Sequence, residues 1–148
     1  MVPPRTPLLA LILAACGLVF AQTVIEPSDR PVSLTGIVNE IHAYGPPGYG
    51  EDKKTDRPVT YLAIELPKAI NIPCTPERPE WKSTDCGATK RLRLFFPSSD
   101  GAARQLESKT KEMKGRQVMI TGKLERQTTA GQYTPIILNV TAIRAARK

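Results

Sequence analysis

Apolar and polar residues alternate in several segments of the chain, and this period of two is typical of strands with one buried face. Every even-numbered residue is apolar or glycine in Val32–Asn39, Tyr61–Leu66 and Arg91–Phe96, and most odd-numbered residues there are polar or charged. The same parity holds in Val118–Leu124, and Ile136–Ile143 is an apolar run of strand length. The alternation predicts five strands of half-buried, mainly antiparallel sheet.

Between the third and fourth of these segments, apolar residues recur at spacings of three and four, which predicts one short amphipathic helix. Ser98, Ser99 or Asp100 can cap its start, and Gly115 stands past its end. Its apolar stripe consists of Ala103, Leu106, Thr110 and Met113. A helix between the third and fourth of five strands indicates an OB-like Greek-key barrel, so the predicted fold class is mainly β.

Two predicted strands share a pattern with a central glycine. Leu34–Val38 reads LTGIV and Ile120–Leu124 reads ITGKL, which places Gly36 and Gly122 in the middle of a strand. A glycine weakens a strand unless the sheet bends sharply there. We therefore expect the first and fourth strands of the barrel to bend at these glycines.

The beginning of the chain has the features of a secretory signal. Leu8–Phe20 is an almost unbroken apolar run preceded by a single charge, Arg5. Thirteen residues rise only about 20 Å as a helix, which is too short for a hydrocarbon core of about 30 Å. A basic residue, a short apolar core and small residues behind it are typical of an export signal, so we expect a periplasmic or secreted protein.

The predicted organisation is a signal segment at 1–21, a linker at 22–31, and an OB-like barrel domain with a basic C-terminal tail at 32–148. Cleavage after Ala21 suits an apolar run that continues to Phe20. The alternative is a lipoprotein anchored to the membrane, because Leu13–Cys16 resembles a lipobox whose cysteine would be lipidated.

After either kind of processing, Cys74 and Cys86 are the cysteines that remain to pair. An even count in an oxidising compartment suggests a disulfide. Closing a loop of about a dozen residues would contribute roughly 3 kcal/mol. A metal site would need His42 as a further ligand, and the spacing fits no zinc pattern. We therefore predict a disulfide, no metal and no cofactor.

Composition and charge add a possible partner. The chain is 41% hydrophobic and 24% charged, which excludes a wholly disordered or multi-span membrane protein. Its net charge of +7 is uneven: residues 22–86 contain 7 basic and 10 acidic residues, and residues 87–148 contain 13 and 4. A basic half attracts polyanions, and an exported protein would meet anionic polymers of the cell envelope.

An OB-like barrel usually binds on the face of its second and third strands, between the first and fourth connecting loops. These loops correspond to residues 42–58 and 126–134. Strand parity points the odd-numbered side chains of the face outward, where rings and guanidinium groups can stack bases or sugars and attract acidic groups. The candidate ligand-binding residues are Tyr44, Tyr49, Tyr61, Arg91, Arg93, Phe95, Arg126 and Tyr133.

Five segments, in this order, resemble the DUF4431 family of exported bacterial domains of unknown function. They read VSLTGIV, YGPPGYGEDK, TYLAIELPKAINI, GRQVMITGKL and YTPIILNVTAI. The resemblance covers Val32 to Ile143 and supplies no reaction and no catalytic residues. Family members often have a histidine near the loop before the last strand, whereas Arg126–Tyr133 contains none.

The leading hypothesis is an exported, monomeric, non-enzymatic binding module whose partner is an envelope protein or an anionic polymer. The first alternative is an oligonucleotide-binding domain that uses the same face. The second is a hydrolase built on the loop carboxylates Glu51, Asp52 and Asp56. No GxSxG, HExxH, Walker or CxxC pattern occurs, and His42, the only histidine, has no clear acid–base partner.

Overall fold

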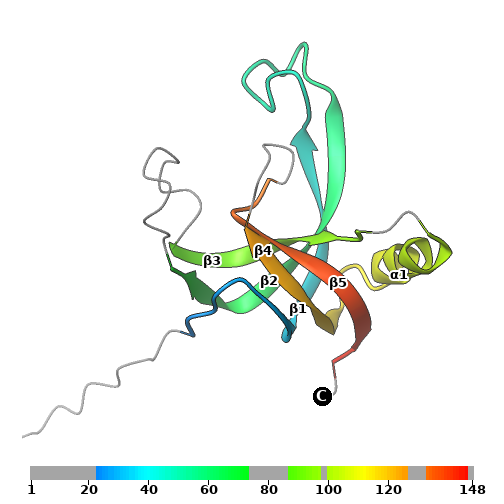
Figure 1. The fold of residues 1–148 in the computed structure, drawn as a ribbon. Coiled ribbons are helices and arrows are strands. Elements are labelled where there is room, and N and C mark those ends of the chain that lie inside the picture. Colours follow the sequence, from blue (N-terminus) through cyan, green and yellow to red (C-terminus); the bar gives the residue numbers. More distant parts are fainter. Residues whose placement is uncertain (1–22, 74–86, 98–99, 127–132, 147–148) are drawn as a thin grey trace, which may run out of the picture.

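The computed structural model describes residues 23–73, 87–97, 100–126 and 133–146. In this part of the chain, five strands and one helix follow one another in the predicted order (Figure 1). The elements are β1 (Ser28–Tyr44), β2 (Pro58–Ile72), β3 (Gly87–Phe95), α1 (Gly101–Glu112), β4 (Gln117–Arg126) and β5 (Ile136–Ala145). The predicted mainly β class is therefore confirmed.

The strands form a closed barrel in the order β1-β2-β3-β5-β4. Antiparallel ladders join β1 to both β2 and β4, β2 to β3, and β4 to β5. The remaining ladder, between β3 and β5, is parallel and short, because it pairs Arg93–Phe95 with Ile137–Asn139. This ladder completes the ring of strands and brings the outward face of β3 beside the start of β5.

Strand β1 is longer than predicted and serves two partners. It begins at Ser28, inside the segment predicted as a linker, and its early residues pair with β4. Ile37 pairs with Glu65 of β2 and also with Gln117 of β4. Residues 28–31 are polar or proline, so they have no apolar alternation, and the pattern placed the start of the strand at Val32. In the structure these residues are exposed.

The two strand glycines lie where neighbouring backbones leave no room for a side chain. A Cβ atom on Gly36 would overlap the carbonyl oxygen of Glu65. A Cβ atom on Gly122 would lie 2.9 Å from the carbonyl carbon of Asn139. The register between β4 and β5 also shifts between Thr121 and Gly122. The shared TG pattern therefore reflects close strand approach, which the sequence analysis, with its expectation of bends, did not predict.

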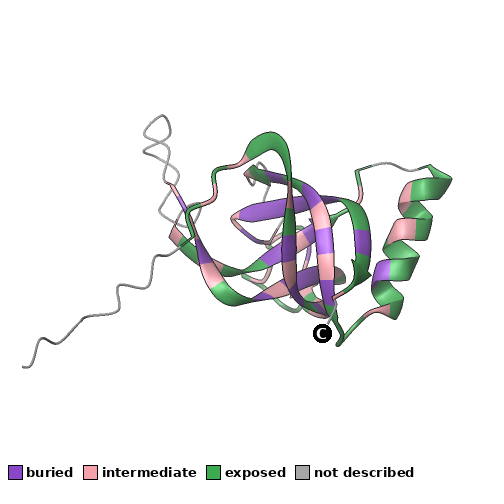
Figure 2. Ribbon diagram, turned by 90° about the horizontal axis from the view of Figure 1, so that it is seen from below, coloured by how far each residue is buried: buried purple, intermediate pink, exposed green. Residues whose placement is uncertain are grey.

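Apolar side chains fill the barrel, all of them even-numbered except Ile143, and buried and exposed residues alternate along much of its strands (Figure 2). Ala63 has the outward parity of β2, yet it is only 1% exposed. Its partners across the two ladders are Asn39 and Arg93, whose longer side chains flank the small methyl group. The core consists of Leu34, Val38, Leu62, Ile64, Leu66, Ile70, Ile72, Leu92, Leu94, Val118, Ile120, Leu124, Ile136, Leu138, Val140 and Ile143.

Helix α1 packs on the barrel through its predicted stripe. Asp100 caps it, since the carboxylate accepts a hydrogen bond from the backbone N–H of Ala103 at 2.9 Å. Leu106 and Met113 pack against the core, and Thr110 is fully buried with its hydroxyl donating to the carbonyl of Leu106. The helix lies beside the barrel, away from the projecting β1–β2 loop (Figure 1).

Candidate ligand-binding site

The β1–β2 loop, which projects beyond the barrel (Figure 1), is held by one buried carboxylate. Asp56 is only 5% exposed and accepts hydrogen bonds from the backbone N–H groups of Gly48 at 2.6 Å and Gly50 at 2.7 Å. Burial raises the pKa of Asp56, but these backbone donors outweigh it and hold the pKa below its ordinary value. The ionised carboxylate therefore anchors the tip of the loop.

Two loop tyrosines adopt a backbone conformation that normally favours glycine. The φ angle is +52° at Tyr49 and +60° at Tyr133, which places both in the left-handed region. Such a conformation costs a residue with a side chain of the order of 1 kcal/mol, and it occurs often at functional sites. The chain nevertheless carries tyrosine at both positions, and their rings meet.

The two loops and β2 contribute to one group of rings. Tyr61 of β2 and Tyr133 stack with their centroids 5.1 Å apart and an interplanar angle of 4°. Tyr49 meets Tyr133 at 6.4 Å with a tilt of 56°. The guanidinium carbon of Arg93 lies 5.5 Å from the centroids of both stacked rings. We call Tyr49, Tyr61, Arg93 and Tyr133 the tyrosine cluster.

The geometry and charge of the cluster decide what it offers to a ligand. The Arg93 guanidinium carbon lies over the Tyr61 and Tyr133 rings at the same distance from both centroids. This distance is within the range of cation–π attraction. Burial raises the pKa of Tyr61, and the nearby Arg91 and Arg93 charges lower it by less, so the pKa stays above its ordinary value. Its phenol remains protonated at neutral pH and can both donate and accept a hydrogen bond.

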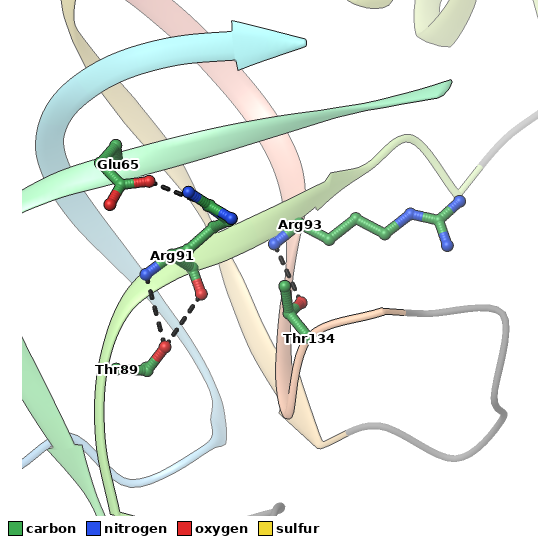
Figure 3. A network of polar contacts seen from close by, with 5 residues as sticks. All are labelled: Glu65, Thr89, Arg91, Arg93 and Thr134. Carbon is green, nitrogen blue, oxygen red and sulfur yellow. Dashed lines mark hydrogen bonds and ion pairs between the residues drawn. The ribbon is translucent and has the colours of Figure 1, made fainter. Parts of the chain in front are cut away.

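A buried threonine ties β3 to the segment that carries Tyr133. The backbone N–H of Arg93 donates to the hydroxyl oxygen of Thr134 at 3.1 Å, and that hydroxyl donates to the carbonyl of Ile136 at 2.7 Å. Figure 3 shows this contact, with the Arg93 side chain extending away from Arg91. Because Thr134 follows Tyr133 directly, the bond fixes the position of Tyr133 relative to the strand face.

Arg91 belongs to a separate polar network on the same face. Its Nε lies 2.9 Å from a carboxylate oxygen of Glu65, in an ion pair that is partly exposed. The hydroxyl of Thr89 donates to the carbonyl of Arg91 and accepts from its backbone N–H (Figure 3). The charge of Arg91 is therefore compensated within the protein.

The other candidate residues lie outside the cluster. The Arg126 guanidinium donates to the carbonyl of Pro73 at 2.6 Å, and the Tyr44 ring receives Lys53 at 5.7 Å. Phe95 is 38% exposed, and the ring contacts among the described residues do not include it. The sequence thus predicted eight residues for one groove, of which four meet. The predicted disulfide of Cys74 and Cys86 lies outside the described residues.

Several contributors to the site were not predicted. Asp56 was considered only as a catalytic carboxylate, and Glu65 and Thr134 were not considered at all. The contact of Glu65 with the site could have been predicted, because strand parity already placed Glu65 on the same outward face as Arg91. Nothing in the sequence indicated that Asp56 anchors the loop, since this role depends on how the loop folds around Gly48 and Gly50.

The described residues hold no group of three His, Cys, Asp or Glu side chains suited to a metal ion. His42 is exposed on β1. Within the same described ranges, no helix is long and apolar enough to cross a membrane.

The stretch 45–57 of the β1–β2 loop contains three acidic and three basic residues. The described basic residues beyond β3 are Arg104, Lys109, Lys111, Lys114, Arg116, Lys123, Arg126 and Arg144.

Comparison with known protein families finds no match for this chain, and no curated protein matches it either. The resemblance to the DUF4431 family therefore remains a prediction from the sequence.

Proposed function

We propose that the chain is an exported, non-enzymatic binding module built on an OB-like Greek-key barrel. The strand order and the helix between β3 and β4 support this assignment. The binding face would be the outward side of β2 and β3, between the loops that follow β1 and β4. Its partner would be an envelope protein or an anionic envelope polymer.

The tyrosine cluster is the observation that carries the proposal. Tyr49 and Tyr133 hold their rings in contact although both backbones would be relieved by glycine. Tyrosine at a positive φ lowers the stability of the fold relative to glycine, so stability alone does not explain its presence at these two positions. A binding surface, in contrast, can use the large ring and the hydroxyl of tyrosine to contact a ligand. The cluster also lies between the two loops where OB-like barrels bind ligands.

The state of Asp56 supports binding over hydrolysis. A general acid works best when its pKa is raised toward the working pH. The pKa of Asp56 is instead lowered, and both of its carboxylate oxygens accept bonds from the loop backbone. Export to the periplasm or the medium rests on the apolar segment at Leu8–Phe20 and on the family resemblance, with a lipoprotein anchored at Cys16 as the alternative.

Retention of envelope material on the immobilised chain tests the proposed function. Tyr61→Ala and Arg93→Ala should each lose most of the material that the parent retains, because each removes a member of the cluster. Arg104→Ala, an equal loss of charge on exposed helix α1, should retain as much as the parent. Circular dichroism of each variant checks its fold. Equal retention by all folded variants would show that the cluster is ordinary surface.

A further inference from the structure

A hollow of about 230 Å³ lies on the outward face of β1, β4 and β5. It shares no residue with the tyrosine cluster. Met119 of β4 pairs with Thr35 of β1 on one side and with Arg144 of β5 on the other, so these three residues form a row across the sheet. The residues that line the hollow are Thr35, Gln117, Met119, Arg144, Ala145 and Ala146.

Arg144 brings a positive charge to this hollow. It is exposed, and a terminal nitrogen of its guanidinium donates to the thioether sulfur of Met119 at 3.0 Å. A thioether is a weak and uncharged acceptor, so this contact positions the guanidinium without compensating its charge. The ion pairs among the described residues do not include Arg144. Its charge is therefore not neutralised within the part of the chain that the structure describes.

The lining also offers neutral groups for hydrogen bonding. Thr35 has a hydroxyl and Gln117 an amide, and each of these groups both donates and accepts. Neither side chain hydrogen-bonds to another of the described residues. A ligand in the hollow can therefore bond to both side chains without breaking a contact within the protein.

Size and charge limit the ligand. Sites for drug-sized molecules have volumes of about 300–1,000 Å³, so a hollow of about 230 Å³ takes a smaller molecule. A guanidinium presents five N–H donors in a planar fork that matches the two oxygens of a carboxylate. A carboxylate carries one negative charge, as Arg144 carries one positive charge, whereas a phosphate group carries close to two. Met119, Ala145 and Ala146 have apolar side chains, which suits a ligand with a small apolar body.

From this arrangement we infer that the hollow binds the carboxylate of a small molecule or of a peptide terminus, with Arg144 as the anchor. The guanidinium donates two N–H bonds to the carboxylate oxygens, in a charge-assisted contact. The Thr35 hydroxyl and the Gln117 amide bond to polar groups next to the carboxylate, and the apolar body lies against Met119. This site goes beyond the proposed function, because it lies on strands other than β2 and β3.

NMR titration of the purified chain with four probes tests this inference. The probes are butyrate, N-acetyl-alanyl-alanine, the neutral amide of that dipeptide, and inorganic phosphate. We expect the better carboxylate to bind with a Kd of about 1 mM and to shift the signals of Gln117, Met119 and Arg144. The neutral amide should bind about tenfold more weakly than the acid. Tighter binding of butyrate identifies a small acid as the source, and tighter binding of the dipeptide identifies a peptide terminus.

Three variants assign the contact to Arg144. Arg144→Gln should weaken both carboxylates by about tenfold and leave the neutral amide as it was. Arg144→Lys, which keeps the charge without the planar fork, should bind with an intermediate affinity. Lys123→Gln is the matched control, since it removes an exposed charge from β4 at a position outside the hollow, and it should bind like the parent chain. Circular dichroism checks the fold of each variant.

Carboxylate binding that persists unchanged in Arg144→Gln would overturn the inference. It would also be overturned by phosphate that binds more tightly than both carboxylates, by an amide as tight as the acid, or by signals that shift only outside the hollow. A titration without any saturable shift would have the same meaning. None of these outcomes bears on the proposed function, because the tyrosine cluster contributes no residue to this hollow.

Discussion

Tyr133 combines a strained backbone with the most connected ring of the cluster. Its φ of +60° suits glycine, while its ring stacks on Tyr61 and meets Tyr49 and Arg93. The side chain thus contributes contacts at a position where the backbone opposes any Cβ atom. Stability and binding make opposite demands on this residue, so substitutions can separate them.

We predict that Tyr133→Gly is more stable than Tyr133→Ala by about 1 kcal/mol. Both variants lose the ring, so the difference isolates the cost of a Cβ atom at positive φ. Both should lose binding equally. Urea unfolding followed by circular dichroism measures the difference. An alanine variant as stable as the glycine variant would mean that the backbone at this position carries no strain.

Asp56 gives the loop a dependence on pH whose sign follows from its pKa. The folded pKa is lowered from the model-peptide value of 3.8, so the ionised form is stabilised by folding. This stabilisation is fully present above pH 3.8 and is lost as the pH falls through the folded pKa. We predict that the amides of Gly48 and Gly50 lose protection from hydrogen exchange only in that acidic range.

Asp56→Asn should show the same loss of amide protection at neutral pH, because an amide side chain has one acceptor oxygen in place of two. Asp52→Asn is the matched control, since Asp52 is exposed and its side chain bonds the nearby N–H of Lys54. Exchange at Gly48 and Gly50 that is the same in both variants at neutral pH would contradict the anchoring role.

Among the elements, β4 depends on a position that excludes any side chain. Gly122→Ala would press a methyl group against the carbonyl of Asn139, so we predict a loss of about 2–3 kcal/mol. Gly101→Ala at the start of α1 meets no atom within 4 Å and should leave stability unchanged or raise it by up to about 1 kcal/mol. Thermal unfolding compares them, and equal effects would contradict the close approach.

Element types could be predicted because period and caps are local properties. Parity identified the inward residues of β3, and Asp100 marked the start of α1. The lengths of the elements could not be predicted in the same way, because the exposed start of β1 shows no alternation of apolar and polar residues. The burial of Ala63 depends on its cross-strand neighbours Asn39 and Arg93, which only the register reveals.

At the scale of the whole molecule, the structure brings together four of the eight residues predicted for one groove. Tyr61, Arg93 and the two loop tyrosines are in contact, as strand parity and loop position suggested. The sequence could not show that Arg91 and Arg126 are engaged by Glu65 and Pro73, because these contacts join distant segments. Local pattern therefore indicates which side chains share a face of the sheet, whereas tertiary contacts determine which of them meet.

The predicted disulfide also concerns the whole molecule. We expect Cys74 and Cys86 to be oxidised in the exported protein, so thiol labelling of the denatured chain should find neither of them reactive. Reduction should lower the free energy of unfolding by roughly 3 kcal/mol, the value for a short loop. Two reactive thiols in the exported chain would contradict the prediction.

The double pairing of β1 has a consequence for how the chain folds during synthesis. The strand at the beginning of the barrel needs β4, which starts at Gln117, and the ring closes only through β3 and β5. Contacts between such distant segments give a high contact order, which slows folding because long loops must close first. Until β5 has emerged, the edges of β3 and β4 stay open to pairing with other chains. A nascent chain of this topology therefore remains unfolded and in need of protection until its last strand is made.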